Sequence, residues 1–339
     1  MRPEPIPRNR FRAVLAALSV LAAPVAVLLA PVPGTPSATA AGLGTRSVPI
    51  PAVSPAITET WSSGPLGDAL TPIAQSSPTP VTLGGQPSVV VGDRGGHLYA
   101  FALLGATPGA GPSLPAPAVP AGWADTHTQA PVDSTPSVAS VAGGTDVLVG
   151  SGDDAFPAGG GYQAFGTDGT LRWESAVANP PSDSAPAGGV FAGIAVAPLQ
   201  AAATSGPSAV AGSLGQVAYA LDPSTGSALP GWPYLNTDST HATSALADLY
   251  GTGRSEVVQA SDQSTGLAQG RLYREGGTLR ILSGTGNEVC RASSDQVLDS
   301  SPAVGGFLAG GTTGIVGGTG DYFPGAADTG TVRAFDTRC

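Results

Sequence analysis

The stretch DVLVGSGDDAFPAGGGYQAFGTDGTLRWES, residues 146–175, decides the fold class. It contains three short runs of β-branched, small and aromatic residues, each bounded by Gly, Asp, Ser or Pro, which is the pattern of short strands joined by turns. Beyond the N-terminal region, no segment shows a sustained helical period. We therefore expect an antiparallel β-structure in which GDDAFPAGGG (152–161) is a connection between two strands.

The same pattern returns along the chain as a repeat. Its leading strands begin at residues 88, 146, 208, 255 and 314. A constant core pattern with irregular spacing indicates one structural unit whose loops vary in length. A short strand precedes most units and a fourth strand follows, often with a tryptophan: Trp173, Trp232 and, in GWAD, Trp123. Four short antiparallel strands per unit predict the blades of a β-propeller.

Two parts of the repeat resemble known propeller families. The stretch ALDPSTGSALPGW (220–232) resembles the A-x-D-x-x-T-G-x-x-x-W repeat of PQQ-like propellers, and AFGTDGTLRW (164–173) matches that repeat in part. The stretch SALADLYGTGRSEVVQASD (244–262) resembles the FG-GAP type of repeat. Together these resemblances cover about residues 60–339 and imply an all-β propeller without implying a particular activity.

We expect about five four-stranded blades, and two alternatives remain for the ring. The fifth unit stops at RAFDTRC (333–339), after its third strand. Either the segment around Trp61 supplies the missing outer strand and closes a five-bladed ring, or the chain is a fragment of a seven- or eight-bladed propeller. We favour the fragment, because PQQ-like propellers usually have seven or eight blades.

The N-terminal region has the pattern of a secretory signal peptide. Four Arg precede an apolar run at 13–30, and an A-x-A cleavage pattern follows at 38–40. We divide the chain into a signal peptide (1–40), a flexible Pro/Ser/Ala-rich segment (41–60) and the repeat domain (61–339). An uncleaved membrane anchor is the alternative. We expect a secreted, extracellular protein, with the cell envelope as a second location.

The charge and the cysteines narrow the choice of partners. The chain has a net charge of −10 and no Lys, so it offers no basic patch for nucleic acid. We expect an extracellular protein or carbohydrate ligand, and membrane contact only through an uncleaved signal segment. Export permits a disulfide between the two cysteines, Cys290 and Cys339. If the chain is a fragment, Cys339 has another partner.

The stretch ADLYGTGRSEVV (247–258) has the outline of a calcium loop with few carboxylates. The weak metal candidates are Asp248 and Glu256, while Tyr250 and Thr252 stand where the FG-GAP pattern has Asp. Calcium requires several oxygen ligands that converge on one point. We therefore expect a turn without metal, in which Asp248 bonds to local amides.

Two loops are candidates for a ligand-binding face. GDDAFPAGGG (152–161) and GDYFPGAADTG (320–330) share Gly-Asp followed by Phe-Pro and a Gly-rich return. In the alternative that we favour, Phe156 and Phe323 only pack these loops against neighbouring blades. The candidate ligand-face residues are Asp153, Asp154, Asp321 and Tyr322.

No catalytic residue is assigned. The three His lack metal-ligand spacing, and no G-x-S-x-G elbow is present. A chance triad of Ser239, His241 and Asp248 is discounted, because side chains so close along one strand diverge. We assign no cofactor, calcium and PQQ being the less favoured alternatives. The expected function is a non-catalytic binding or scaffold module, and the alternative is a cofactor- or metal-dependent enzyme of the PQQ-dehydrogenase type.

Overall fold

The computed structural model describes most of the repeat domain and no residue before Trp61. The described residues are 61–66, 70–103, 118–152, 160–177, 188–199, 206–236, 238–264, 266–268 and 271–338. The predicted signal peptide and the segment 41–60 lie outside these ranges. Within them the regular structure consists of strands and one 3₁₀ turn, η2 (Ala309–Gly311). The described part of the chain holds no helix of the length and apolar character needed to cross a membrane.

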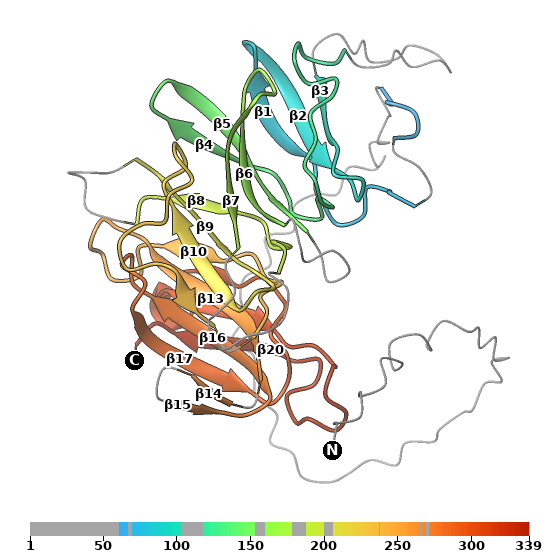
Figure 1. Ribbon diagram of the computed structural model, residues 1–339. Helices are drawn as coiled ribbons and strands as arrows, with labels where there is room; N and C mark the ends of the chain where they lie inside the picture. The colour runs from blue at the N-terminus through green and yellow to red at the C-terminus, as the bar shows by residue number, and fades with distance from the viewer. Residues whose placement is uncertain are drawn as a thin grey trace, which may run out of the picture. The chain divides into compact units, whose positions relative to one another are not determined.

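Apart from one two-stranded hairpin, the strands form five antiparallel sheets that follow one another in chain order (Figure 1), which we number blades 1 to 5. Blade 1 contains β1 (Thr79–Leu83), β2 (Gln86–Gly92) and β3 (Leu98–Ala102). Blade 2 contains β4 (Ser137–Val141), β5 (Gly144–Ser151), β6 (Gly161–Gly166) and β7 (Leu171–Ala176). Blade 3 contains β8 (Ala195–Ala197), β9 (Ser208–Gly212), β10 (Val217–Leu221) and β11 (Tyr234–Leu235).

The last two blades complete the set. Blade 4 contains β12 (Ala245–Ala247), β13 (Glu256–Gln263), β16 (Gly276–Leu282) and β17 (Glu288–Ser294). A separate hairpin of β14 (Gly266–Ala268) and β15 (Arg271–Tyr273) is inserted between β13 and β16. Blade 5 contains β18 (Ala303–Gly305), β19 (Gly314–Gly318) and β20 (Val332–Asp336). The all-β fold with five propeller-type blades is thus confirmed.

Two expected outer strands do not form. Trp123 lies in a turn, where its N–H donates to the Pro120 carbonyl. The Trp61 segment is not a strand of blade 5, because Gly64 has a φ of 74° and Pro65 has no N–H to donate to a neighbouring strand. Instead, the Trp61 ring packs against Phe101 of β3, with ring centroids 6.0 Å apart. The described residues 61–66 thus add no strand to blade 5, and closure of the ring by the residues before Trp61 stays untested.

The apolar core lies between successive blades. Four clusters of buried side chains occupy the junctions 1/2, 2/3, 3/4 and 4/5. Strand β9 shows why, since all five of its residues are buried. Its alternating side chains point to opposite faces of the sheet: Ala209 and Ala211 join the cluster shared with blade 2, and Val210 joins the cluster shared with blade 4.

Three junctions are also joined by a tryptophan. In each, the indole Nε1–H donates to a carbonyl in the turn that follows the third strand of the next blade. The bonds are Trp123 to Thr167 O (3.0 Å), Trp173 to Pro223 O (2.7 Å) and Trp232 to Gly284 O (3.1 Å). These bonds explain why tryptophan recurs in the repeat.

The fourth junction differs. Cys290 pairs with Ile281 beside a bulge, as Trp173 pairs with Ala164 beside a bulge in blade 2. Cys290 therefore occupies the tryptophan position of blade 4. It is disulfide-bonded, and the one other cysteine of the chain, Cys339, lies outside the described residues. The pairing of Cys290 with Cys339 stays a prediction.

Candidate functional site

A short segment leads into the first strand of each blade, and its residues can be matched between blades by backbone hydrogen bonds. In blades 2 to 5, the N–H of Gly152, Leu214, Asp262 or Gly320 donates to the carbonyl of Pro131, Gly189, Ser239 or Val297, respectively. In each leading segment, the residue two positions after the acceptor is therefore equivalent to its counterpart in the other blades. That position holds Asp133, Phe191, His241 and Asp299 in blades 2 to 5.

At the junction of blades 1 and 2, these positions form an ion pair. Arg94 is the blade 1 equivalent of Asp262, since its N–H donates to Pro72 O in the same way. Its guanidinium contacts Asp133 through Nη2–Oδ2 (2.9 Å) and Nε–Oδ1 (3.1 Å). This bidentate arrangement offsets the burial of the Asp133 carboxylate, whose side chain is 0% exposed.

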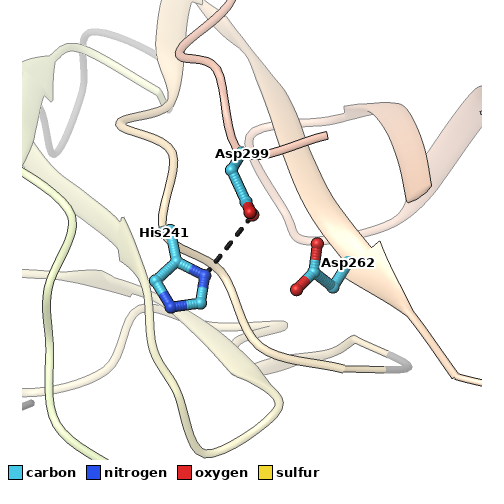
Figure 2. A group of neighbouring side chains, drawn as sticks. All are labelled: His241, Asp262 and Asp299. Carbon is cyan, nitrogen blue, oxygen red and sulfur yellow. Dashed lines mark ion pairs between the residues drawn. The ribbon is translucent and has the colours of Figure 1, made fainter. Parts of the chain in front are cut away.

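At the junction of blades 4 and 5, the same two positions are both acidic. Asp262 replaces the arginine, and Asp299 is the equivalent of Asp133. His241, from the segment that leads into β12, is the third member, and Figure 2 shows the three side chains converging from separate segments. One ligand atom from each lies within 4.8 Å of the others. We call these residues the His241–Asp262–Asp299 cluster.

The cluster is held by its neighbours and remains open to solvent on one side. His241 Nδ1 lies 3.4 Å from Asp299 Oδ1, and their side chains are 24% and 43% exposed. The edge of the His241 ring contacts Phe191 of blade 3, with centroids 5.4 Å apart. Ser239 Oγ lies 3.5 Å from Asp262 Oδ2. Each ring or carboxylate therefore has a defined position.

The two carboxylates have opposite pKa shifts. Burial, followed by the charge of Asp299 and a hydrogen bond with it, raises the pKa of Asp262 to about 8. Burial opposes ionisation of Asp299 as well, but the hydrogen bond and charge of His241 lower the net pKa of Asp299. At neutral pH the pair therefore shares one proton, which resides on Asp262.

The donor set suits a divalent transition metal. An imidazole nitrogen favours zinc-like ions, whereas calcium and magnesium prefer oxygen ligands alone. Three protein ligands leave coordination positions open for a water molecule or a ligand. Asp238 lies beside the cluster and accepts hydrogen bonds from Ser239 N–H and Ser264 Oγ, so the neighbouring loop is itself ordered by a carboxylate.

Asp248 and Glu256, the metal candidates predicted from the sequence, accept hydrogen bonds from backbone amides of a turn instead. Asp248 Oδ1 accepts the N–H of Thr252 (2.8 Å) and Oδ2 accepts that of Gly253 (2.7 Å). These two bonds lower the pKa of Asp248. Glu256 Oε2 accepts the N–H of Leu249 (2.9 Å). The expected bonding of Asp248 to local amides is confirmed.

The predicted ligand-face residues are only partly described. Asp153 and Asp154 lie outside the described residues, as does Phe156. Asp321 and Tyr322 are exposed in the loop between β19 and β20.

The next residue of that loop is anchored within blade 5, and the expected packing of Phe323 against a neighbouring blade stays a prediction. Phe323 exchanges two hydrogen bonds with the Gln296 side chain: its N–H donates to Oε1 (2.9 Å) and its carbonyl accepts from Nε2 (3.0 Å). Its ring meets Tyr322 edge-on, with centroids 5.0 Å apart. The loop is therefore tied to the segment that leads into blade 5.

The four tryptophans of the chain are used for packing rather than for stacking on a quinone cofactor. Such a cofactor needs aromatic stacking partners. Trp123, Trp173 and Trp232 are committed to blade junctions, and Trp61 packs against Phe101. The four tryptophans are thus accounted for by packing.

Sequence reasoning missed the cluster. Spacing along the chain relates His241 to the other two His and to Ser239 and Asp248, and not to Asp262 or Asp299. The signal lay in the comparison of repeats: the position held by Arg94 in blade 1 is acidic in blade 4, opposite another acid in blade 5. That register becomes visible only when the backbone bonds between segments are known.

The comparisons with known proteins concern the fold. No protein-family model and no curated protein matches the chain. Among solved structures, the computationally designed Ika8 protein is similar at 13% identity and a TM-score of 0.40, over 74% of this chain and 55% of that one. The quinohemoprotein alcohol dehydrogenase ADHIIG from Pseudomonas putida HK5 is similar at 17% identity and a TM-score of 0.37, over 61% and 33%.

BamB from Moraxella catarrhalis is a third similar structure, at 14% identity and a TM-score of 0.29, over 75% of this chain and 82% of that one. The chain therefore spans about half the length of the designed protein and a third of that of the dehydrogenase. At these TM-scores the similarities carry no argument about function, which rests on the residues themselves.

Proposed function

We propose that this protein is an exported, non-catalytic binding module built from PQQ-like and FG-GAP-like propeller repeats, and that it binds its ligand through a divalent metal ion held by His241, Asp262 and Asp299. One observation carries the proposal. An imidazole and two carboxylates converge at positions where the equivalent residues of blades 1 and 2 form an Arg–Asp ion pair.

The charge balance supports a cation at this place. Two carboxylates within contact distance cannot both ionise without a positive partner. Without metal, burial and the charge of Asp299 raise the pKa of Asp262 to about 8, so Asp262 keeps a proton that relieves the repulsion. A divalent ion would replace that proton and neutralise both acids, because metal binding requires deprotonated ligands.

The ligand class follows from the open coordination positions. Three protein ligands leave at least one position of a tetrahedral zinc ion for an outside donor. Asp299 is 43% exposed, so this side is accessible. A carboxylate of an extracellular protein or a hydroxyl of a carbohydrate would supply the donor atom. The N-terminal signal sequence is the support for an extracellular location.

A metal-dependent enzyme is the second candidate. Catalytic zinc sites also have three protein ligands and an open position for water. The observation that favours this candidate is the same solvent-open geometry. The ion would then activate a bound water rather than hold a ligand.

Calorimetry on the dialysed, EDTA-treated native protein tests the metal site. Titration with Zn²⁺ at pH 7.5 is expected to give one saturable site, and titration with Ca²⁺ none. His241→Ala and Asp262→Asn should each weaken Zn²⁺ binding by about tenfold or more. The matched control is Asp321→Asn, an exposed acid of blade 5 outside the cluster. A Zn²⁺ affinity that is unchanged in both cluster variants would contradict the proposal.

A second measurement separates a binding module from an enzyme. Retention of the Zn²⁺-loaded protein on immobilised extracellular glycans or proteins, lost on EDTA treatment and without turnover, supports the module. EDTA-sensitive hydrolysis of ester or phosphoester substrates that is abolished by His241→Ala would instead establish the enzyme.

A further inference from the structure

We propose a second binding site, independent of the metal cluster: the cavity between blades 4 and 5 binds a planar aromatic group that carries a carboxylate. The cavity has a volume of about 280 Å³. Its apolar wall is formed by Leu279, Ile281, Cys290, Ile315 and Phe335, which come from both blades.

The cavity lies where the other junctions hold an indole ring. By strand register, Cys290 and Ile281 correspond to Trp173 and Ala164 of blade 2. At the 2/3 junction, Trp173 packs against a continuous buried cluster and donates to Pro223 O. At the 4/5 junction the tryptophan is replaced by a much smaller cysteine. Cys290 is disulfide-bonded, yet its side chain is smaller than an indole, and the cavity of about 280 Å³ lies beside it.

The wall chemistry favours an aromatic ring. The cavity is partly open to solvent, and a ring placed against its apolar wall gains dispersion contacts with that wall. The Cys290 sulfur also provides a polarizable surface of the kind that favours aromatic contacts. The volume is near the lower end of the range of ligand pockets, about 300 Å³. A single or fused aromatic ring, rather than a larger ligand, matches this space.

The charges at the cavity favour an anionic ring substituent. Arg291 and Arg338 line it together with one acid, Asp336. Arg338 contacts Asp336 through Nη2 (2.5 Å) and Nε (2.9 Å). A guanidinium has five N–H donors, so these two bonds do not exhaust its capacity. Arg291 Nε also lies 3.8 Å from Glu288 Oε1. The further N–H donors of the two guanidinium groups give the cavity a place for a carboxylate.

N-acetyl-L-tryptophan is the probe, since it joins an indole to a carboxylate. Calorimetry and saturation-transfer NMR are run in EDTA, so that the metal cluster is empty. We expect saturable 1:1 binding below about 10 mM, with the uncharged N-acetyl-L-tryptophanamide at least about fivefold weaker. Asp262→Asn should leave this binding unchanged, which separates its outcome from that of the metal proposal. Absence of saturable binding to the native protein would overturn the inference.

A filled-cavity variant locates the site. Cys290→Trp places a tryptophan at the repeat position, and Cys339→Gly removes the other cysteine. The double variant should lower probe affinity by about tenfold or more while the fold is retained by circular dichroism. The matched control, Cys290→Ser with Cys339→Gly, removes both cysteines without filling the space and should stay within about threefold of native. Ala292→Phe, which leaves the cysteines intact, should also weaken binding. Equal affinity of the filled variant and its control would contradict the location.

Discussion

At the residue scale, the same residue type has opposite roles in one blade. Asp248 satisfies turn amides within five residues of chain, and its pKa is lowered by them. Asp262 faces another carboxylate across a blade junction, and its pKa is raised to about 8. The first role follows from local turn chemistry. The second depends on contacts between segments more than thirty residues apart, from Asp262 to Asp299.

The raised pKa of Asp262 predicts a pH dependence of stability that Asp262→Asn removes. In the unfolded chain an Asp titrates near pH 3.9, so between about pH 4 and 8 only the folded state keeps the proton. Metal-free native protein should therefore lose stability as pH rises through this window. At pH 8 the variant should melt about 2–6 °C higher than native, corresponding to about 1–2 kcal/mol after allowance for solvent screening. At pH 4 the two should be equal.

Thermal melts in EDTA at several pH values from 4 to 8.5 provide the measurement. Asp321→Asn is the control, because this exposed acid lies outside the cluster. If native protein gains stability relative to Asp262→Asn between pH 5 and 8, the assigned proton is wrong.

At the scale of the element, each blade depends on a bond made to the next one. Trp173 of β7 donates to Pro223 O of blade 3, and its ring packs against the buried cluster of that junction. The strand pattern of β7 alone gives no reason for a tryptophan, because this edge strand alternates between exposed and half-buried residues. The reason lies in the neighbouring blade.

Trp173→Phe should therefore destabilise the protein more than a tryptophan change outside a junction. The variant keeps an aromatic ring and removes the Nε1 donor, so the Pro223 carbonyl loses its partner. We expect a loss of about 1–3 kcal/mol. Trp61→Phe is the matched control, since Trp61 packs against Phe101 at the start of the domain. Urea denaturation measures both, and an equal loss for the two variants would contradict the role assigned to the indole bond.

How much of the fold could be predicted from sequence also differs by element. The recurring β-branched runs predicted the five blades, because strand and turn signals are local. The hairpin β14–β15 was foreseen only as a long insertion, and Trp123 was placed in a strand that does not form. The position of Trp123 is fixed by its bond to Thr167 O in the next blade, and no local sequence pattern predicts a bond between blades. The His241–Asp262–Asp299 cluster was missed for the same reason.

At the scale of the whole repeat domain, stability is shared between neighbours. Each buried cluster combines side chains of two successive blades, and β9 contributes to two clusters at once. A blade taken alone would expose both of its apolar faces. Repeat proteins of this kind are stabilised by interfaces between neighbours as well as by each unit. A substitution that destabilises one junction should therefore lower the stability of the other junctions as well.

Leu282→Ala tests this coupling. Leu282 is fully buried at the 3/4 junction, in the cluster with Val257 and Trp232. Truncation leaves a cavity and should cost about 2–5 kcal/mol. Because the blades unfold together, amide exchange in β2 of blade 1 should accelerate along with exchange in β13 of blade 4. Hydrogen-exchange mass spectrometry at increasing urea concentrations measures both segments in one sample. The control is Val289→Ala, whose side chain is 44% exposed on β17 and whose loss should cost less than about 0.5 kcal/mol. Faster exchange confined to blades 3 and 4 would show that the junctions are energetically independent and that the repeat domain unfolds in parts.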